Sequence, residues 1–508
     1  MELSKENNIE NSGGYRRTIK YLGVFGGTQG LSMLLNVVRN KIASVLLGVS
    51  GLSIIALYNR TLQMFCDSTG LSLSLSAVRG LAEAYDKDDN EALLHNIKVV
   101  RSIALFSGMM GMLLMLLITP FIGDWVFGSN MYYVLRLMML SPVVLFMAVT
   151  NGEMAVLRGT RRLTAIALYS VATALMALLV SVILYLFFGL AGIFPSLFVT
   201  GLLQMCIMLY FSRHYYTYRA KPFSIRVLKE GIDIVKLGAG YIFVTMLASC
   251  AIWFIYSILS YIGNGETAGL FNAGYVIITL LPGVLFSALD SEYYPRLSGV
   301  ASDVKTRNSM VNEQAEVQLL VQSPLLIAFV VAMPLLIPLL NDITFSEAVP
   351  MAQIAMLGMF MRTMTYPVSF LPVSKNDTVT FVLLESVYNI LLVVTVVLGY
   401  SLARFVGIGV GIAFAHIIDF VIVAIVARYK YDMILSGSVI RYFVMQLPLM
   451  LCAISLSTLY HLQTTYWIAG GVIVVVSLAV TISMLRKQTS LFEKVSRVCS
   501  KILRKLRI

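Results

Sequence analysis

Two cations lie inside the first long apolar stretch of this chain, where charged side chains are rare. Arg39 and Lys41 belong to the segment LNVVRNKIASVLLG, residues 35–48. A charge near the centre of a bilayer costs about 3 kcal/mol on insertion scales, so such a residue faces water or other polar groups. Arg binds phosphate through forked, charge-assisted hydrogen bonds. The two cations are therefore candidates for binding an anionic group within the membrane.

Helical spacing separates the two cations. Polar residues recur at intervals of three and four from Gln29 to Asn40, and Arg39 lies on this stripe. Lys41 is rotated by about 200° from Arg39 in a regular helix. It is about 10 Å from the predicted outer end, so two interpretations stay open for it. Lys41 either extends to the membrane surface or contacts the substrate, whereas Arg39 is expected to face a central lumen.

Other apolar stretches carry polar residues with the same periodicity. Arg60 and Asp67 share a face of the second stretch, and His416 and Asp419 lie one helical turn apart. We expect contact with an anionic head group or a glycan from Arg39, Lys41, Arg60, Arg362, Arg136, Asn36, Asn59, Asn272 and Tyr275. The candidates for coupling to protons or sodium are Asp67, Asp290, Glu385, His416 and Asp419.

Two explanations account for the intramembrane charges. They could pair with one another and hold a helix bundle together, or they could line a wet central cavity that is basic in its outer half. Polar stripes on several separate stretches favour the cavity, because a single assumption then explains all of them. Arg79, Glu153 and Glu292 fall near predicted cytoplasmic ends, where we expect them to be solvated.

The composition defines the class of protein. The chain has 508 residues, of which 58% are hydrophobic and only 13% charged, whereas soluble domains carry about 25% charged residues. Apolar runs near 20 residues are long enough to cross the bilayer. We predict an all-α polytopic membrane protein with about fourteen spans, at roughly 19–47, 51–80, 98–118, 132–157, 164–188, 193–213, 235–260, 270–296, 316–340, 350–373, 379–399, 406–427, 442–460 and 466–485.

The distribution of basic residues predicts the orientation. Alternate loops hold nearly all Lys and Arg residues outside the spans, with Arg404 as the exception. The positive-inside rule then places both termini in the cytoplasm. The net charge of +12 is explained by this topology, so we do not expect nucleic-acid binding. The five cysteines show no paired spacing, and we predict neither a disulfide nor a metal site.

Two similar halves are indicated by the order of the spans. The stretch SGLSIIALYN at 50–59 resembles AGLFNAGYV at 268–276, and each follows a short outer turn. Such internal repeats are typical of secondary transporters. We predict two pseudo-symmetric six-helix lobes around a central cavity, at 19–213 and 235–427, joined by a linker at 214–234. A cytoplasmic segment at 1–18 precedes them. Two extra C-terminal helices at 428–485 and a basic amphipathic cytoplasmic tail at 486–508 follow.

These patterns resemble the Wzx-type polysaccharide flippases of the multidrug/oligosaccharidyl-lipid/polysaccharide exporter superfamily. The matching stretches are KIASVLLGVSGLSIIALYN (41–59), AGLFNAGYVIITLLPGVLFSALDSEYYPRLS (268–298) and LGMFMRTMTYPVSFLPVSKNDTVTFVLLE (357–385). The resemblance spans roughly 15–430. It implies alternating access and a cargo of undecaprenyl-pyrophosphate-linked oligosaccharide, such as an O-antigen or capsule repeat unit for polysaccharide or lipopolysaccharide biosynthesis, moved to the outer leaflet of the bacterial cytoplasmic (inner) membrane.

The resemblance also implies partners. These are membrane lipids and a periplasmic-side polysaccharide polymerase, and we expect a monomer without cofactors. Many Wzx proteins have twelve spans, whereas related lipid II flippases have fourteen, so a peptidoglycan-precursor flippase is an alternative. A cation-coupled multidrug exporter would need a cavity dominated by carboxylates. A membrane enzyme would need a large loop or a catalytic motif, and the sequence shows neither, so we predict a transporter and no enzyme.

Overall fold

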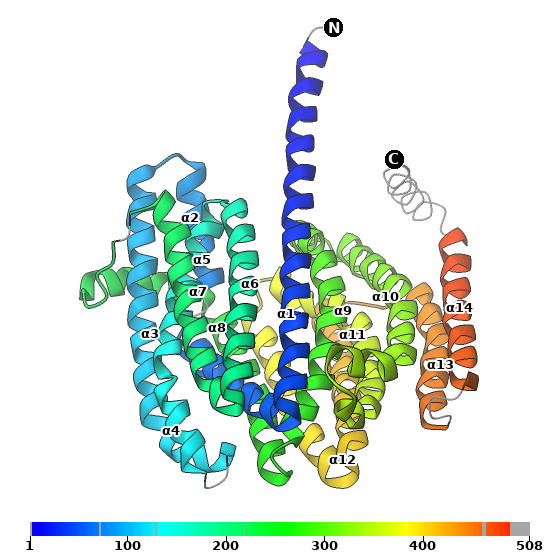
Figure 1. The fold of residues 1–508 in the computed structure, drawn as a ribbon. Coiled ribbons are helices and arrows are strands. Elements are labelled where there is room, and N and C mark those ends of the chain that lie inside the picture. Colours follow the sequence, from blue (N-terminus) through cyan, green and yellow to red (C-terminus); the bar gives the residue numbers. More distant parts are fainter. Residues whose placement is uncertain (1–2, 71–72, 128–129, 218, 460–463, 488–508) are drawn as a thin grey trace. The chain divides into compact units, whose positions relative to one another are not determined.

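The computed structural model describes residues 3–70, 73–127, 130–217, 219–459 and 464–487. The described side chains begin at Gly27 and omit several positions in 73–79, 225–238 and 281–295. Within these ranges the chain is helical and has no strand (Figure 1). This confirms the all-α prediction.

The chain folds as two compact units. Unit 1 comprises Met1–Leu270 and Leu340–Thr344, and unit 2 comprises Phe271–Leu339 and Phe345–Ile508. The lobe limits predicted from the sequence stay a prediction. The helices up to the end of unit 1 are α1 (Leu3–Thr69), α2 (Leu73–Asp86), α3 (Asn90–Phe127), α4 (Met131–Met139), α5 (Ser141–Gly159), α6 (Leu163–Phe188), η1 (Gly189–Gly192), α7 (Ile193–Tyr215) and α8 (Ile225–Ile262).

Most of the second unit is formed by the helices from α9 to α14. Among them α11 and α12 pack closely, and α13 lies against α14 (Figure 1). The helices are α9 (Thr267–Gly299), whose first turn belongs to unit 1, α10 (Val304–Leu340), η2 (Ile343–Ala348), α11 (Val349–Ser374), α12 (Thr378–Tyr431), α13 (Gly437–Leu459) and α14 (Thr464–Lys487).

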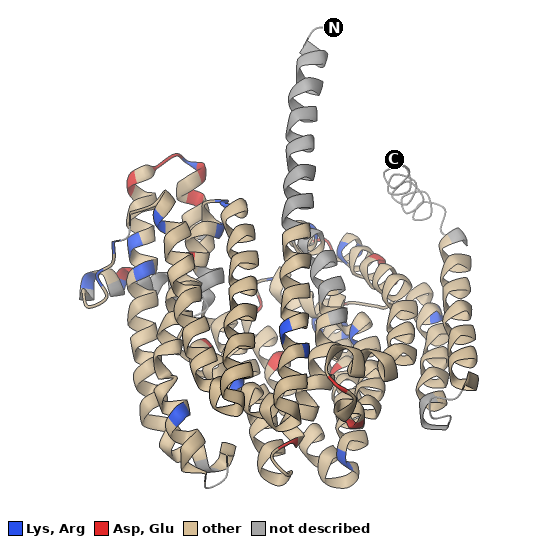
Figure 2. Ribbon diagram, viewed as in Figure 1, with Lys and Arg blue, Asp and Glu red and all other residues tan. Residues whose placement is uncertain are grey.

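Ten helical stretches of the described residues are long and apolar enough to cross a membrane. Three of them, at 27–69, 163–215 and 378–431, each include most of two spans predicted from the sequence, although the predicted span 51–80 extends beyond Thr69, where α1 ends. A shorter apolar stretch of α9, Thr267–Leu280, corresponds to a further span. In Figure 2 most of the ribbon in both units is free of acidic and basic residues. The chain is a multi-pass membrane protein.

Breaks in the longest helices explain why single elements contain two spans. In α1, Gly48 has φ +67° and ψ −166°, and in α12 the break lies at Ala403 and Arg404. A positive φ is readily adopted by Gly. Arg404 has φ +50°, a region that side chains other than Gly rarely occupy. The chain therefore reverses within two residues at the centre of α12.

Three glycines allow the halves of α12 to cross closely. A Cβ on Gly399 would lie 2.1 Å from the carbonyl oxygen of Gly407, and one on Gly411 would lie 2.3 Å from that of Thr395. These pairs are symmetric about the break, so the halves run antiparallel. Their far ends also meet, because Lys430 forms an ion pair with Asp377 at 2.7 Å. The helix α12 is therefore a hairpin of two membrane spans.

Buried apolar side chains join the helices of each unit. In unit 1, Leu81 of α2, Ile97 of α3 and Val156 of α5 belong to one buried cluster. In unit 2, Val311 of α10 and Leu371 of α11 belong to another. These contacts fix the helices that carry the polar residues described next.

Candidate functional site

A polar cavity lies between α11 and α12 of unit 2. Its volume is about 60 Å³. Because one water needs about 10–15 Å³ by this measure, the cavity has room for a few waters or a small ion in this conformation. Its lining residues are Arg362, Thr365, Tyr366, Ser369, Phe381, Leu384, Glu385, Tyr388, His416, Asp419 and Val423. Four of the sequence-predicted site residues, Arg362, Glu385, His416 and Asp419, thus come together.

Among the described residues, Arg362 is the one Lys or Arg that lines this cavity. Its guanidinium carbon lies 5.4 Å from the ring centre of Tyr366 and 5.7 Å from that of Phe286. Glu385 and Tyr275 are within electrostatic range. Among the described residues no hydrogen bond or ion pair to Arg362 is found. Its donors are therefore available to an anionic group, and aromatic rings hold the guanidinium in place.

Two carboxylates and a histidine occupy the α12 side of the cavity. Asp419 and His416 come from the second half of α12, and Glu385 comes from the first half. His416 is buried, and its Nε2 lies 3.3 Å from the hydroxyl of Tyr388. His416 also packs against Gly358 of α11, where a Cβ would lie 2.7 Å from its ring. The hairpin crossing thus sets the distance between the acidic groups.

The cations of the first span face other parts of unit 1. Arg39 is within electrostatic range of Tyr185 in α6, and nearby Asn40 donates a hydrogen bond to Asn341 at 2.8 Å. Hydrogen bonds, chiefly from the Thr344 hydroxyl, lower the pKa of Asp342, and the Lys41 ammonium adds to this shift. Lys41 therefore lies near the loop that follows α10.

The second half of α1 packs along α8. The guanidinium of Arg60 lies 5.0 Å from the ring centre of Tyr256. Asp67 accepts hydrogen bonds from Gln63 at 2.8 and 2.9 Å and from the Ser249 hydroxyl. The sequence predicted that Arg60 and Asp67 share a face of the helix, and in the structure both contact α8.

The other predicted residues are dispersed. Arg136 of α4 lies 3.9 Å from the Tyr132 ring centre and donates to the Ala191 carbonyl at 3.4 Å. Asn36 donates to the Ser32 carbonyl of its own helix at 3.0 Å, and Asn59 is exposed. Two further candidates lie in α9: Asn272 is half-buried, and Tyr275 stacks on Phe271 with ring centres 5.0 Å apart. The side chains of Asp290, Arg79 and Glu292 lie outside the described residues.

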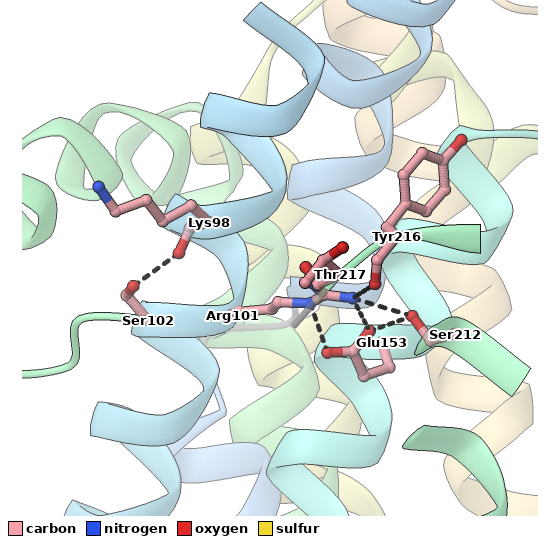
Figure 3. Close-up of polar contacts among 7 residues, drawn as sticks. All are labelled: Lys98, Arg101, Ser102, Glu153, Ser212, Tyr216 and Thr217. Atoms are coloured by element: carbon pink, nitrogen blue, oxygen red, sulfur yellow. Dashed lines mark hydrogen bonds and ion pairs between the residues drawn. The ribbon is translucent and has the colours of Figure 1, made fainter. Parts of the chain in front are cut away.

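Glu153 corrects the expectation of a solvated carboxylate. It is 1% exposed, and both of its oxygens accept from Arg101, at 2.7 and 3.0 Å (Figure 3). Arg101 also donates to the carbonyl of Thr217 at 2.7 Å, and Ser212 donates to Glu153. Sequence reasoning missed this site because Arg101 and Glu153 lie 52 residues apart. The network fastens the chain that leaves α7 onto α3 and α5.

A second buried arginine has a similar place in unit 2. Arg307, at the start of α10, is 1% exposed and donates to the carbonyls of Ala301 and Tyr431. Its Nε has no partner in the described part of the chain. Asn308 donates to the Asp432 carbonyl at 2.7 Å, and Asn312 to the Ile434 carbonyl at 2.9 Å. The start of α10 thereby holds the segment between α12 and α13.

Two glutamines further along α10 are unusual. Gln318 and Gln322 are fully buried one turn apart, and no side-chain nitrogen or oxygen of either has a hydrogen-bond partner in the described part of the chain. By contrast, the buried Gln446 of α13 bonds to Ser477 and Thr481 of α14. An unpaired buried amide costs about 1–3 kcal/mol. The sequence shows the spacing of these glutamines but not their missing partners.

The described cysteines, Cys66, Cys206, Cys250 and Cys452, form no disulfide, and Cys499 lies outside the described residues. No cluster of potential metal ligands is found among the described residues.

Comparison with known proteins places the chain in a class. Residues 18–300 match the model of the family described as polysaccharide biosynthesis protein. The match covers more than half of the chain, so the protein belongs to this family. No curated protein matches the sequence.

Solved structures share the fold. A lipid II flippase, MurJ, in an inward closed conformation matches with a TM-score of 0.69 and 13% identity over 92% of this chain and 99% of its own. An inward-facing multidrug resistance transporter of the MATE family in the MOP superfamily matches with a TM-score of 0.66 and 15% identity, over 79% of this chain and 94% of its own. A MOP superfamily transporter from Pyrococcus furiosus matches with a TM-score of 0.57 and 14% identity, over 81% of this chain and 94% of its own. The fold is therefore that of MOP superfamily transporters.

Proposed function

We propose that the protein is a flippase that moves an undecaprenyl-pyrophosphate-linked oligosaccharide from the inner to the outer leaflet of the cytoplasmic membrane. Membership of the polysaccharide biosynthesis family supports the glycan. The observation that carries the proposal is Arg362, a cavity cation for which no hydrogen-bond acceptor or ion-pair partner is found among the described residues. A guanidinium binds phosphate groups, including those of pyrophosphate, in forked geometry.

The transport cycle requires a conformational change. The unit 2 cavity of about 60 Å³ is too small for an oligosaccharide, because pockets for drug-sized ligands are about 300–1,000 Å³. In the open state the pyrophosphate binds Arg362, with Arg39 and Arg60 as further contacts predicted from the sequence. The hydroxyl groups of Tyr366 and Ser369 form hydrogen bonds with the glycan, and the prenyl tail stays in the lipid.

The orientation with both termini in the cytoplasm is part of this proposal. It is supported by basic residues in the last turns of α5, α7 and α12, namely Arg158, Arg213, Arg428 and Lys430. These ends all fall on the predicted cytoplasmic side.

The experiment measures flipping of a fluorescent undecaprenyl-pyrophosphate oligosaccharide in proteoliposomes. Wild type is compared with Arg362→Ala and with Arg158→Gln, which changes an exposed arginine at the end of α5. We expect flipping to fall at least tenfold in Arg362→Ala and to persist in Arg158→Gln. Equal flipping in all three proteins would show that Arg362 does not bind the cargo. Lipid II, assayed in parallel, distinguishes the peptidoglycan-precursor alternative.

A second candidate function is a cation-coupled exporter. Glu385 and Asp419 line the same cavity as Arg362, and carboxylates attract cations. Uptake of a cationic dye that depends on Asp419, together with no flipping of either lipid by wild type, would favour this function. If oligosaccharide flipping instead requires both Arg362 and Asp419, the carboxylates serve to couple the flippase to an ion.

A further inference from the structure

A second, larger pocket lies beside the polar cavity in unit 2. Its volume is about 250 Å³. It is formed by α11, the second half of α12, the following loop and the start of α13, and its residues are Thr365, Val368, Phe420, Val423, Ala424, Ala427, Arg428, Met433, Ile434, Leu435 and Ile440. Nine of these eleven side chains are apolar. Its polar lining residues are Thr365 and Arg428, so the pocket fits a hydrocarbon chain better than a sugar.

One cation stands at the rim of this pocket. Arg428 lies in the last turn of α12 and is exposed. In the described part of the chain no hydrogen bond or ion pair to Arg428 is found, whereas the neighbouring Lys430 pairs with Asp377. Ile434 and Ile440 of the pocket wall are 58% and 48% exposed. The pocket therefore opens at the protein surface near the end of α12, beside the Arg428 guanidinium.

We propose that this pocket binds an anionic phospholipid of the bilayer, with one acyl chain between α12 and α13 and its phosphate on Arg428. The apolar wall and the single cation match the two parts of such a lipid. Arg428 lies nine residues beyond Asp419, about 13 Å along the helix. A phosphate at Arg428 therefore occupies the helix end, the level of head groups, and leaves the deeper Arg362 free.

The lipid pocket shares two wall residues with the polar cavity. Thr365 of α11 and Val423 of α12 line both spaces. A chain that fills the pocket therefore pushes on the same side chains that shape the cavity around Arg362. Bound anionic lipid regulates transport through this shared wall; this consequence, unlike the binding itself, rests on the proposed function.

The test uses phosphatidylglycerol with a photoactivatable diazirine on one acyl chain, added to the full-length protein in phosphatidylethanolamine vesicles. Labelled peptides are identified by mass spectrometry. We expect labelling within residues 420–440, and a fall of at least fivefold in Arg428→Gln and in Ala424→Phe, which fills the pocket. Arg158→Gln is the matched control and should label as wild type. Size-exclusion elution verifies that each variant is folded, and the exposed Arg428 keeps the test usable if Ala424→Phe misfolds.

Three outcomes would overturn the proposal. Undiminished labelling in Arg428→Gln would show that Arg428 does not bind the head group. Equal labelling by diazirine phosphatidylethanolamine would show that the pocket does not select anionic lipid. Displacement of the label by undecaprenyl phosphate but not by unlabelled phosphatidylglycerol would assign the pocket to a prenyl chain. Labelling is measured without cargo, so a failed flipping assay and a failed labelling assay are separate results.

Discussion

Arg101 in unit 1 and Arg307 in unit 2 are both buried arginines, but different groups stabilise their charges. Both are buried in a helix that forms the third span of its predicted half, and both donate to carbonyls of the chain that leaves the sixth span. Arg101 is also neutralised by Glu153, which is as buried as the arginine. For Arg307 only backbone carbonyl acceptors are found among the described residues.

The difference shows where each unit places its carboxylate. Unit 1 places Glu153 directly on the buried guanidinium. In unit 2, Asp377 instead contacts the chain beside the carbonyl that Arg307 binds: it pairs with Lys430 and accepts a hydrogen bond from the Tyr431 hydroxyl at 2.6 Å. A buried ion pair is costly to break because the remaining charge is stranded. Unit 1 should therefore be the more sensitive to removal of its acid.

The largest effect is expected from Glu153→Gln. This change leaves the Arg101 guanidinium buried without a counter-charge, which costs about 3–5 kcal/mol. Thermal unfolding in detergent measures the loss. The matched control is Asp86→Asn, which breaks the exposed Arg161–Asp86 pair and should cost less than about 1 kcal/mol. Equal losses in both variants would mean that Arg101 is solvated.

Arg307→Met should destabilise the protein less. The substitution removes the charge together with its hydrogen bonds, so no ion is stranded, and we expect a loss of about 1.5–3 kcal/mol. The segment between α12 and α13 should become easier to open, and hydrogen exchange at residues 432–436 reports this. If exchange there is unchanged, Asn308 and Asn312 hold the segment without Arg307.

Gln318→Met and Gln322→Met should stabilise the protein. Each replaces an amide without a partner by an apolar side chain of similar length, and we expect a gain of about 1 kcal/mol per site. The control is Gln446→Met, which removes bonds to α14 and should lower the thermal midpoint. A fall in all three variants would show that the α10 glutamines have partners in solution.

The smallest effect concerns Asp377 and pH. Hydrogen bonds, first from Lys430 and then from Tyr431, lower the pKa of Asp377 below its usual 3.8. A depressed pKa stabilises the folded state above the unfolded-state pKa, and this stabilisation is lost as pH falls through the folded-state pKa. Asp377→Asn should therefore be less stable than wild type at pH 7 by under about 1 kcal/mol. The two unfolding curves should converge below pH 3.8, and a constant gap would contradict the assignment.

Composition and periodicity predicted the class and much of the local structure. The reversals at Gly48 and near Arg404 fall between predicted spans, because glycines and a charge interrupt apolar runs there. The grouping of Arg362 with Glu385 and Asp419 was not predicted as a unit. The contacts of the α12 hairpin, at its glycines and at Asp377 and Lys430, bring residue 385 near residue 419. Contacts between two apolar helices leave little trace in periodicity.

The Arg101–Glu153 pair could not be predicted for a different reason. Each residue lies near the end of a predicted span, where exposed charges are common, and nothing local marks it as buried. The missing partners of Gln318 and Gln322 and the apolar pocket beside Arg428 likewise depend on what neighbouring helices supply. Pairing and cavity shape are tertiary properties that one sequence does not display.

The α12 hairpin also bears on how the chain is inserted. Only Ala403 and Arg404 separate the two halves, so we expect both halves to enter the bilayer together. The ends of the hairpin meet at Asp377 and Lys430, which puts Arg404 at the opposite end of the membrane from them. In the proposed orientation, Arg404 therefore crosses the bilayer during synthesis together with the apolar halves on either side of it.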